Sequence, residues 1–242
     1  MIKQISFCLY FFFKLFNDLI KLLFKKDILL WFYTFVQRDS YISKKIKKQR
    51  ILFFCPNHLI KFRVETLFNK EPETINWIDN FKKNKKKEKI IFWDVGANIG
   101  LYSIYSSVTY KNKINIVTFE PSTNNLRILS RNISINKLYK NISINQMPLG
   151  SAVNEYIKFQ DNDFNEGSAF NNLNSSQKKI NSNINNNTYK IFSTTMDSLM
   201  KHRDFQCPNY LKIDVDGNEK FILRGAKNLF KNLNLRGVLI EI

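Results

Sequence analysis

The sequence predicts an α/β fold for residues 90–242, a mostly parallel sheet with helices on both faces. From residue 90 onward, short apolar runs of strand length alternate with longer amphipathic segments, a pattern typical of strand–helix–strand units. Three of these runs end at or near an acid: Asp94, Glu120 and Asp214. Ligands of parallel sheets bind beyond the carboxyl ends of the strands, so these acids mark a candidate site.

Upstream of this domain we expect two further parts. Residues 1–49 form a basic, apolar N-terminal helical extension, and residues 50–89 form a subdomain. Within this subdomain, the apolar runs around "PNH" predict a hairpin over 50–68. A short helix over 71–81 and a charged, solvated connector over 82–89 follow.

The elements of the sheet domain follow from its periodicity and its turn residues. Pro121 suits the first turn of a helix, and the Asn-, Ser- and Lys-rich stretch 161–189 predicts a long loop whose "EGS" at 166–168 could reach the site. We expect strands at 90–95, 114–120, 142–150, 156–160, 210–217 and 237–242, and helices at 98–110, 121–136 and 218–232.

The formal net charge is +18, and residues 1–89 carry 20 Lys and Arg against 8 acids. Such a surface favours a nucleic acid or an anionic membrane as partner. Frequent Lys, Asn and Ile with few Arg residues offer another explanation, codon bias in an AT-rich genome. The cysteines, Cys8, Cys55 and Cys207, have neither metal-site nor disulfide spacing, which favours a reducing, cytoplasmic compartment.

Residues 4–36 are strongly aromatic and aliphatic, but their charge-free pieces are shorter than the ~20 apolar residues that span a bilayer. No small-residue cleavage site of a signal peptide follows the first run. Read as a helix, the segment has a stripe of Lys14, Asp18, Lys21 and Lys25 opposite a broad apolar face. It therefore either packs on protein, its own or a copy, or gives residues 1–45 a peripheral membrane contact.

The turn after the first strand has the spacing D-x-G-x-N-x-G, from Asp94 to Gly100. The middle glycine of a dinucleotide fingerprint is missing, and no G-K-[ST] of a P-loop is present. A glycine turn with an acid before it and another acid after the second strand suits S-adenosylmethionine. Asp94 then faces the ammonium end, and Glu120 binds the ribose hydroxyls.

The remaining candidate cofactor contacts surround these two acids. The "MPLG" turn at 147–150 lies where the adenine should rest. The full set of expected cofactor-binding residues is Asp94, Gly96, Ala97, Asn98, Gly100, Glu120, Pro121, Ser122 and Leu149. Purely structural explanations stay open: Gly96 and Gly100 for a tight turn, and Glu120 for capping the next helix.

Six blocks in order resemble the FkbM-type methyltransferases, a family of class I enzymes that use S-adenosylmethionine. They are "DVGANIGLYS" (94–103), "FEPS..N...L..N" (119–132), "GS" (167–168), "TTMDSL" (194–199), "YLKIDVDGNE..IL.GA" (210–226) and "VLIEI" (238–242). The resemblance covers roughly residues 50–242. It implies a seven-stranded Rossmann-like fold and O-methylation of a hydroxyl on a sugar, glycan or secondary metabolite. The family normally continues past the last block, so we expect a domain that is incomplete at its C-terminus.

Methyl transfer to a hydroxyl needs alignment above all, and it benefits from a base. Asp214 is the first candidate base, with Asp216 and Glu219 as alternates. Asp214 and Asp216 could instead hold a divalent ion, although no metal site is expected; Asp216 could equally cap the helix from 218. Glu71 has two explanations: it simply precedes its helix and has no role in the site, or it lies on the cofactor side of the site.

Two other functions stay open. An RNA methyltransferase would use the same fold and the basic surface, but it is expected to carry an N-P-P-Y-type motif or a catalytic Cys where this chain has "DVDG". A truncated, non-catalytic cofactor-binding module is the second alternative. We expect a small-molecule or glycan acceptor and no nucleic acid.

Overall fold

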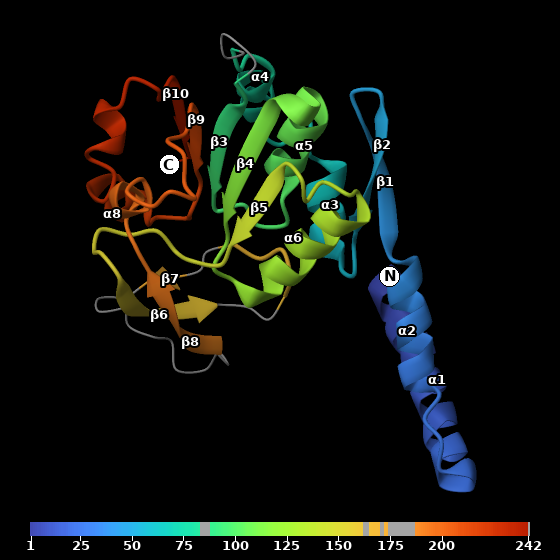
Figure 1. Ribbon diagram of the computed structural model, residues 1–242. Coiled ribbons are helices and arrows are strands. Elements are labelled where there is room, and N and C mark those ends of the chain that lie inside the picture. Colours follow the sequence, from blue (N-terminus) through green and yellow to red (C-terminus); the bar gives the residue numbers. More distant parts are fainter. Residues whose placement is uncertain (83–87, 162–164, 170–171, 174–186, 242) are drawn as a thin grey trace. The chain divides into compact units, whose positions relative to one another are not determined.

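A computed structural model describes residues 1–82, 88–161, 165–169, 172–173 and 187–241 (Figure 1). The chain divides into two compact units, Met1–Tyr41 and Ile42–Ile242. Each unit is described by itself below.

The first unit is a pair of helices, α1 (Ile2–Phe24) and α2 (Leu29–Asp39). The buried Asn17 accepts hydrogen bonds from the backbone N–H groups of Ile28 and Leu29, both at 2.9 Å, which satisfies two donors at the start of α2. Phe13 and Phe32 pack with ring centroids 4.7 Å apart. Among the described residues, no helix combines the length and apolarity that crossing a membrane requires.

Two boundaries predicted from the sequence are wrong. The extension is not helical to residue 49, because β1 (Tyr41–Ile46) pairs with β2 (Gln49–Phe54) in a two-stranded sheet. The hairpin therefore lies before "PNH", and α3 (His58–Glu65) follows it. The side chain of Asn57 accepts from the Ile60 N–H at 2.9 Å and caps this helix, a local bond that apolar patterning does not show. The predicted short helix is confirmed as α4 (Pro72–Asp79).

The main sheet has five parallel strands in the order β10-β9-β3-β4-β5. All six residues of β3 are buried, as expected for a central parallel strand covered on both faces. The order reverses between β3 and β9, and ligands of open α/β sheets bind at such a point. The strands are β3 (Ile90–Val95), β4 (Ile114–Phe119), β5 (Ile142–Asn145), β9 (Tyr210–Ile213) and β10 (Gly237–Ile240).

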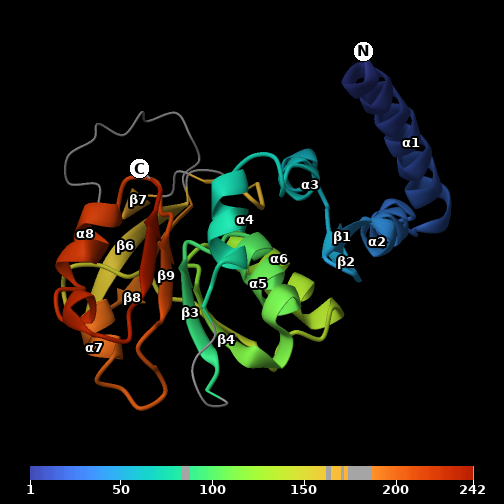
Figure 2. The same cartoon turned by 90° about the horizontal axis from the view of Figure 1, so that it is seen from above.

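Helices cover both faces of this sheet, as predicted. α5 (Leu101–Tyr110) and α6 (Thr123–Ile135) lie on one face, and α8 (Glu219–Arg224) lies on the other (Figure 2). The predicted helix over 218–232 ends at Arg224, and only a 3-10 turn, Leu229–Lys231, continues it. Gly225 is the C-cap of this helix, and a Cβ there would lie 2.1 Å from the Gly150 carbonyl oxygen, so the chain packs closely on a neighbouring turn. The remaining short elements are α7 (Met196–Leu199) and a 3-10 turn at Lys111–Lys113.

A second, antiparallel sheet replaces part of the predicted loop. Its order is β7-β6-β8, from β6 (Glu155–Asp161), β7 (Asn172–Leu173) and β8 (Asn187–Ser193). The loop prediction over 161–189 is therefore wrong at both ends, and most of its middle lies outside the described residues. The predicted strand over 142–150 also ends early, at Asn145, before the turn that carries Leu149. These segments lie near the carboxyl ends of β3 and β4 (Figure 1).

Candidate active site

The turn between β3 and α5 is built from glycines in left-handed conformations. Gly96 has φ +81°, and a Cβ there would lie 1.7 Å from the Asp214 carbonyl oxygen. Gly100 has φ +86°, and a Cβ there would lie 2.5 Å from Leu129 Cδ1. Both positions demand glycine because the protein's own chain packs against them. The turn thereby sets the ends of β3 and β9 side by side.

Glu120 fixes this turn from the end of the neighbouring strand. Its Oε2 accepts the Asn98 N–H at 2.7 Å, and its Oε1 accepts the Ser122 N–H at 2.9 Å. The side chain is buried at 4% exposure. Glu120 therefore organises the start of α6 and the glycine turn together. A carboxylate offers about four lone-pair sites, so it can accept further bonds from ligand hydroxyls.

A small cavity of about 60 Å³ opens beside Glu120. Apolar side chains form one wall, and Asn98, Ser168 and Asp214 bring polar atoms to the other. Asn98 Oδ1 and Ser168 Oγ are buried and have no hydrogen-bond partner among the described residues. Such atoms are costly unless a ligand or water binds them. The apolar wall consists of Val95, Phe119, Met147, Leu149, Phe159 and Ile222.

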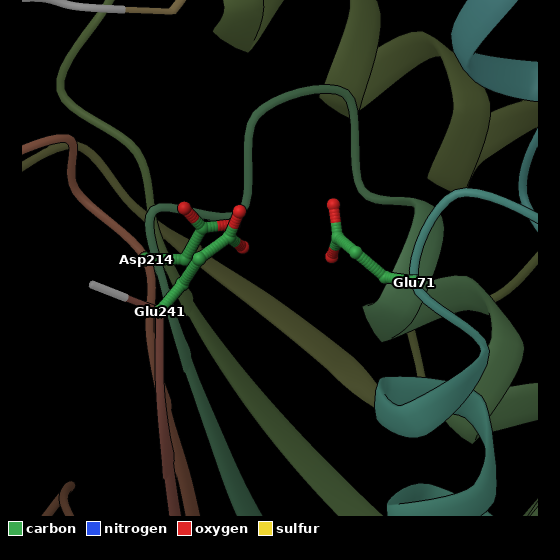
Figure 3. A group of neighbouring side chains, drawn as sticks. All are labelled: Glu71, Asp214 and Glu241. Atoms are coloured by element: carbon green, nitrogen blue, oxygen red, sulfur yellow. The ribbon is translucent and has the colours of Figure 1, made fainter.

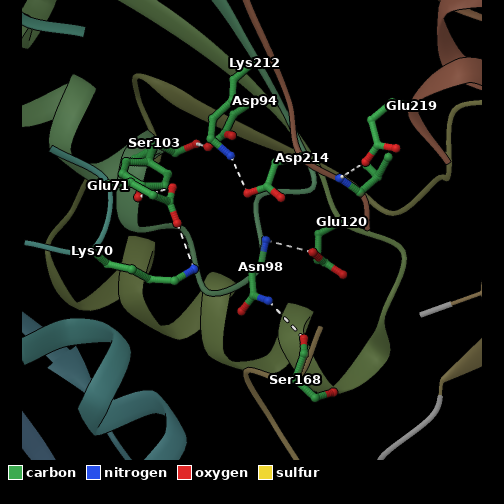
Figure 4. A network of polar contacts seen from close by, with 12 residues as sticks. Lys70, Glu71, Asp94, Asn98, Ser103, Glu120, Ser168, Lys212, Asp214 and Glu219 are labelled. Carbon is green, nitrogen blue, oxygen red and sulfur yellow. Dashed lines mark hydrogen bonds and ion pairs between the residues drawn. The ribbon is translucent and has the colours of Figure 1, made fainter. Parts of the chain in front are cut away.

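The "EGS" segment reaches this cavity, as its composition suggested. The Ser168 carbonyl accepts from Asn98 Nδ2 at 3.0 Å, and the Gly167 carbonyl accepts from Arg63 Nε at 2.7 Å. Gly167 itself has φ +82°. Asn98 therefore connects the glycine turn, Glu120 and this segment (Figure 4).

A second cavity of about 360 Å³ shares Gly96, Asn98, Asp214 and Asp216 with the first. Its charged lining consists of four carboxylates and two cations, Arg63 and Lys70. Oxygens of Glu71, Asp214 and Glu241 all lie within 4.8 Å of one another. Figure 3 shows Asp214 and Glu241 side by side, with Glu71 facing them from a different part of the chain.

A fully buried lysine stands behind these carboxylates. Lys212 Nζ lies 2.5 Å from Asp214 Oδ2 and 5.0 Å from the centre of the Tyr102 ring. Asp94 is buried next to it and accepts the Ser103 hydroxyl at 2.5 Å, whereas its Oδ1 has no partner among the described residues. Burial raises the pKa of Asp94, and the Lys212 charge opposes that rise.

The two glutamates differ in their surroundings. Glu71 accepts from Lys70 Nζ at 2.8 Å and from the Tyr102 hydroxyl at 2.5 Å (Figure 4 shows the lysine contact). Burial and the Glu71 contact raise the pKa of Tyr102, so this phenol stays protonated and donates. Burial, followed by the charge of Asp214, raises the pKa of Glu241 to about 7. Glu241 is thus the carboxyl group whose charge changes near neutral pH.

These three carboxylate side chains have the spacing at which a divalent ion could be held. Cations already contact two of them, Lys70 at Glu71 and Lys212 at Asp214. Asp216, which the sequence pairs with Asp214, is not part of this group of three, although it lines both cavities with Asp214.

Of the twelve predicted site residues, eight line at least one of the two cavities and four do not. Seven line the first cavity: Gly96, Asn98, Glu120, Pro121, Leu149, Asp214 and Asp216. Ala97 lines the second. Asp94, Gly100, Ser122 and Glu219 are not among the described residues that line either cavity.

Those four residues have other contacts. Ser122 caps α6 through the Asn125 N–H, and Gly100 packs on Leu129. Glu219 accepts the Gly217 N–H at 3.0 Å and so holds the turn after β9. Asp216 has φ +52° and does not cap α8, whose N-cap is Asn218.

Sequence reasoning missed Lys212 and Glu241 and left Glu71 open. The available signal for Lys212 was a lone cation inside the apolar strand "YLKI", which is rare in a strand buried on both faces. Glu241 had the same signal as the other acids, since it directly follows the last strand, β10.

The sequence also matches a family model. The methyltransferase FkbM domain model matches residues 94–242, more than half of the chain. This chain belongs to the FkbM methyltransferase family. Among curated proteins, none is recognisably similar to it in sequence.

Similar solved structures include two methyltransferases. An FkbM methyltransferase from Methylobacillus flagellatus KT is 15% identical, with 73% of this chain and 40% of that one covered and a TM-score of 0.41. A precorrin-6Y C5,15-methyltransferase from Geobacter metallireducens GS-15 is 11% identical, with 84% and 69% covered and a TM-score of 0.40. The chain therefore spans less than half the length of the FkbM structure it resembles.

Membership of the FkbM family implies S-adenosylmethionine as methyl donor, and the site fits it. Glu120 stands at the end of the second strand, where a carboxylate can bind a ribose. Met147 and Leu149 form an apolar part of the same cavity, of a kind that suits an adenine ring. The unpartnered oxygens of Asn98 and Ser168 remain for polar groups of the ligand.

Proposed function

We propose that this FkbM methyltransferase methylates a hydroxyl group of a sugar, glycan or secondary metabolite. The observation that carries the proposal is the junction of the two cavities at Gly96, Asn98 and Asp214. One cavity has the lining that suits the cofactor. The other has the carboxylates that suit an acceptor with hydroxyl donors.

In the first cavity, Glu120 would hold the ribose hydroxyls and Leu149 would pack on the adenine. Gly96 and Asp214, which line both cavities, would then face the remaining end of the cofactor. When bound, the cofactor supplies an electrophilic methyl group on a positively charged sulfur. The protein's contribution is to hold the acceptor oxygen in line with that methyl group and to exclude water.

The acidic pair at the junction takes the proton. Asp214 or Glu241 would accept the proton that the acceptor hydroxyl gives up when it takes the methyl group. Glu241 suits this role because its pKa of about 7 lies near the working pH. Lys212 holds Asp214 in place through their contact at 2.5 Å.

Carboxylates also select the acceptor class. Neighbouring hydroxyls of a sugar can donate to Glu71, Asp214 and Glu241, which line the second cavity. Four carboxylates line this cavity against two cations, Arg63 and Lys70. This excess of negative charge supports a neutral polyol as acceptor rather than the phosphates of an RNA strand.

A cytoplasmic location goes with this proposal. The structure has Cys8, Cys55 and Cys207 as free thiols, which suits a reducing compartment.

The test is methyl transfer from labelled S-adenosylmethionine to parallel panels of acceptors: monosaccharides and oligosaccharides, small polyols and phenols, and total RNA. We expect label in the sugar or polyol panel and none in RNA. The matched variants are Glu241→Gln, which removes a proton acceptor, and Glu73→Gln, which removes an exposed acid of α4. Label in RNA alone, or no cofactor binding by a well-folded chain, would contradict the proposal.

A further inference from the structure

The helix pair at the N-terminus exposes an unusually large apolar surface. Phe12 is 75% exposed, Leu22 79% and Trp31 65%. Monomeric soluble proteins rarely leave a contiguous patch of this kind uncovered. The exposed large apolar residues of α1 and α2 are Ile2, Ile5, Phe7, Leu9, Tyr10, Phe11, Phe12, Leu15, Phe16, Leu19, Leu22, Leu23, Phe24, Leu30, Trp31, Phe32, Tyr33, Phe35 and Val36.

On α1, the lysines lie together on one side, which also carries Asp18 and Phe7, and a broad apolar face lies opposite. At 100° per residue, Lys3, Lys14, Lys21 and Lys25 fall in one narrow arc. The apolar series that starts at Ile5 and includes Leu9, Phe12, Phe16, Leu19 and Leu23 runs along the opposite side. A cationic stripe opposite an aromatic and aliphatic face is typical of helices that lie in a membrane interface.

The width of this face argues against a coiled-coil seam between two copies. A seam is a narrow stripe flanked by charged residues that pair across the interface. Here the flanking positions are themselves apolar and exposed, as at Leu15 and Leu22. A surface this wide is covered by a lipid layer more completely than by one partner helix.

The charge of the chain also favours a lipid surface over a second copy of the chain. The chain has a formal net charge of +18, so two copies repel each other whereas an anionic surface attracts each of them. The exposed Trp31 and Tyr33 of α2 add amphipathic rings of the kind enriched at membrane–water interfaces. The helix pair does not need further protein to form, because Asn17 and the Phe13–Phe32 contact already join α1 to α2.

From these observations we propose that α1 and α2 lie in the plane of an anionic lipid surface, with the apolar face of α1 in the acyl boundary and its lysines at the headgroups. This attachment is independent of the acceptor proposed above. It needs no membrane-spanning segment, in agreement with the helices that the structure describes.

Co-sedimentation of the full chain with vesicles tests the proposal, using phosphatidylcholine alone and phosphatidylcholine mixed with phosphatidylglycerol. We expect strong binding to the mixed vesicles and weak binding to phosphatidylcholine. Phe12→Gln combined with Leu19→Gln should lower the affinity about a hundredfold, since two apolar side chains leave the acyl boundary.

Two double lysine variants test whether positive charge on α1 contributes to binding. Lys14→Gln combined with Lys21→Gln should weaken binding to the anionic vesicles about tenfold or more. Lys227→Gln combined with Lys231→Gln removes the same charge from exposed sites of the second unit and should leave binding unchanged. Equal binding to both vesicle types, or equal loss in both lysine pairs, would overturn the proposal.

A further experiment tests whether a second copy of the chain, instead of lipid, covers the apolar face. If Phe12→Gln with Leu19→Gln abolishes a dimer in sedimentation equilibrium while the wild-type chain ignores vesicles, the face is covered by a second copy and the proposal fails. Cofactor binding by each variant confirms that the second unit is folded.

Discussion

Lys212 Nζ lies 2.5 Å from Asp214 Oδ2, and the lysine side chain is 1% exposed while the aspartate remains 26% exposed. The cation is thus buried inside the sheet, and its partner stands at the opening between the two cavities. Asp94 is buried beside the same lysine. One buried cation therefore holds the acids at the ends of β3 and β9.

Replacing Lys212 should cost both stability and activity. Lys212→Met leaves Asp94 and Asp214 without their cation, and breaking such a pair costs about 3 kcal/mol of unfolding free energy. Urea unfolding measures the loss. Lys212→Arg keeps the charge and should recover part of the stability; a Met variant as stable as the wild type would show that the pair contributes nothing.

Glu120 is predicted to contribute most to cofactor affinity. Glu120→Gln keeps the size but weakens bonds to the ribose hydroxyls, so calorimetric affinity for S-adenosylhomocysteine should fall about tenfold or more. Thermal unfolding must accompany the titration, because Glu120 also accepts the Asn98 and Ser122 N–H groups. Glu73→Gln is the control. If the variant binds the cofactor as tightly as the wild type does, Glu120 does not bind the ribose.

Asn98 allows the ligand contact to be separated from the backbone conformation. Its φ is +50°, so Asn98→Gly keeps the left-handed turn without strain and removes only the side chain. We expect cofactor affinity to fall about three- to tenfold, since a buried oxygen without a protein partner is lost. Thermal unfolding must accompany the titration, because Asn98 Nδ2 also donates to the Ser168 carbonyl at 3.0 Å. Unchanged affinity in the glycine variant would exclude Asn98 from the ligand shell.

The pH dependence should follow Glu241. Its pKa of about 7 predicts that kcat rises as pH increases through 7, because the carboxylate that accepts the proton then forms. Glu241→Gln should lower kcat and remove this rise. A wild-type profile that is flat between pH 6 and 8 would point to another base.

The same shift affects stability with a definite sign. Because the folded-state pKa lies above the model value of 4.5, the folded protein binds the proton more tightly than the unfolded chain does. Wild-type stability relative to Glu241→Gln should therefore be greatest below about pH 4.5 and decline as pH rises toward about 7. Chemical unfolding of both proteins across that range measures the difference.

Metal removal should leave methyl transfer unchanged. Lys212 and Lys70 already neutralise Asp214 and Glu71, so the acidic cluster does not require a divalent ion for charge balance. Assays after treatment with EDTA, with and without added Mg²⁺ or Mn²⁺, test this point. Loss of activity that Mg²⁺ restores would instead assign the carboxylates to a metal.

The sequence by itself determined the architecture of the sheet domain and its functional edge. Buried strands such as "IIFWDV" are apolar because both faces are covered, and that requirement is visible locally. The acids Glu120 and Asp214 follow their strands directly, so their common edge follows from parallel topology. The glycine turn is equally local, because a left-handed φ at Gly96 and Gly100 restricts the residue type.

Only the tertiary structure decided which of these residues meet. Glu71 precedes α4, Lys212 lies in β9 and Glu241 follows β10, and only the packing of these elements brings their charges together. The N-terminal hairpin was misplaced for the same reason: in β2, the Phe54 N–H finds its acceptor on Asn132 of α6, a long-range bond at 2.9 Å. Local patterns reveal burial and turns, whereas the pairing of distant polar groups depends on the whole fold.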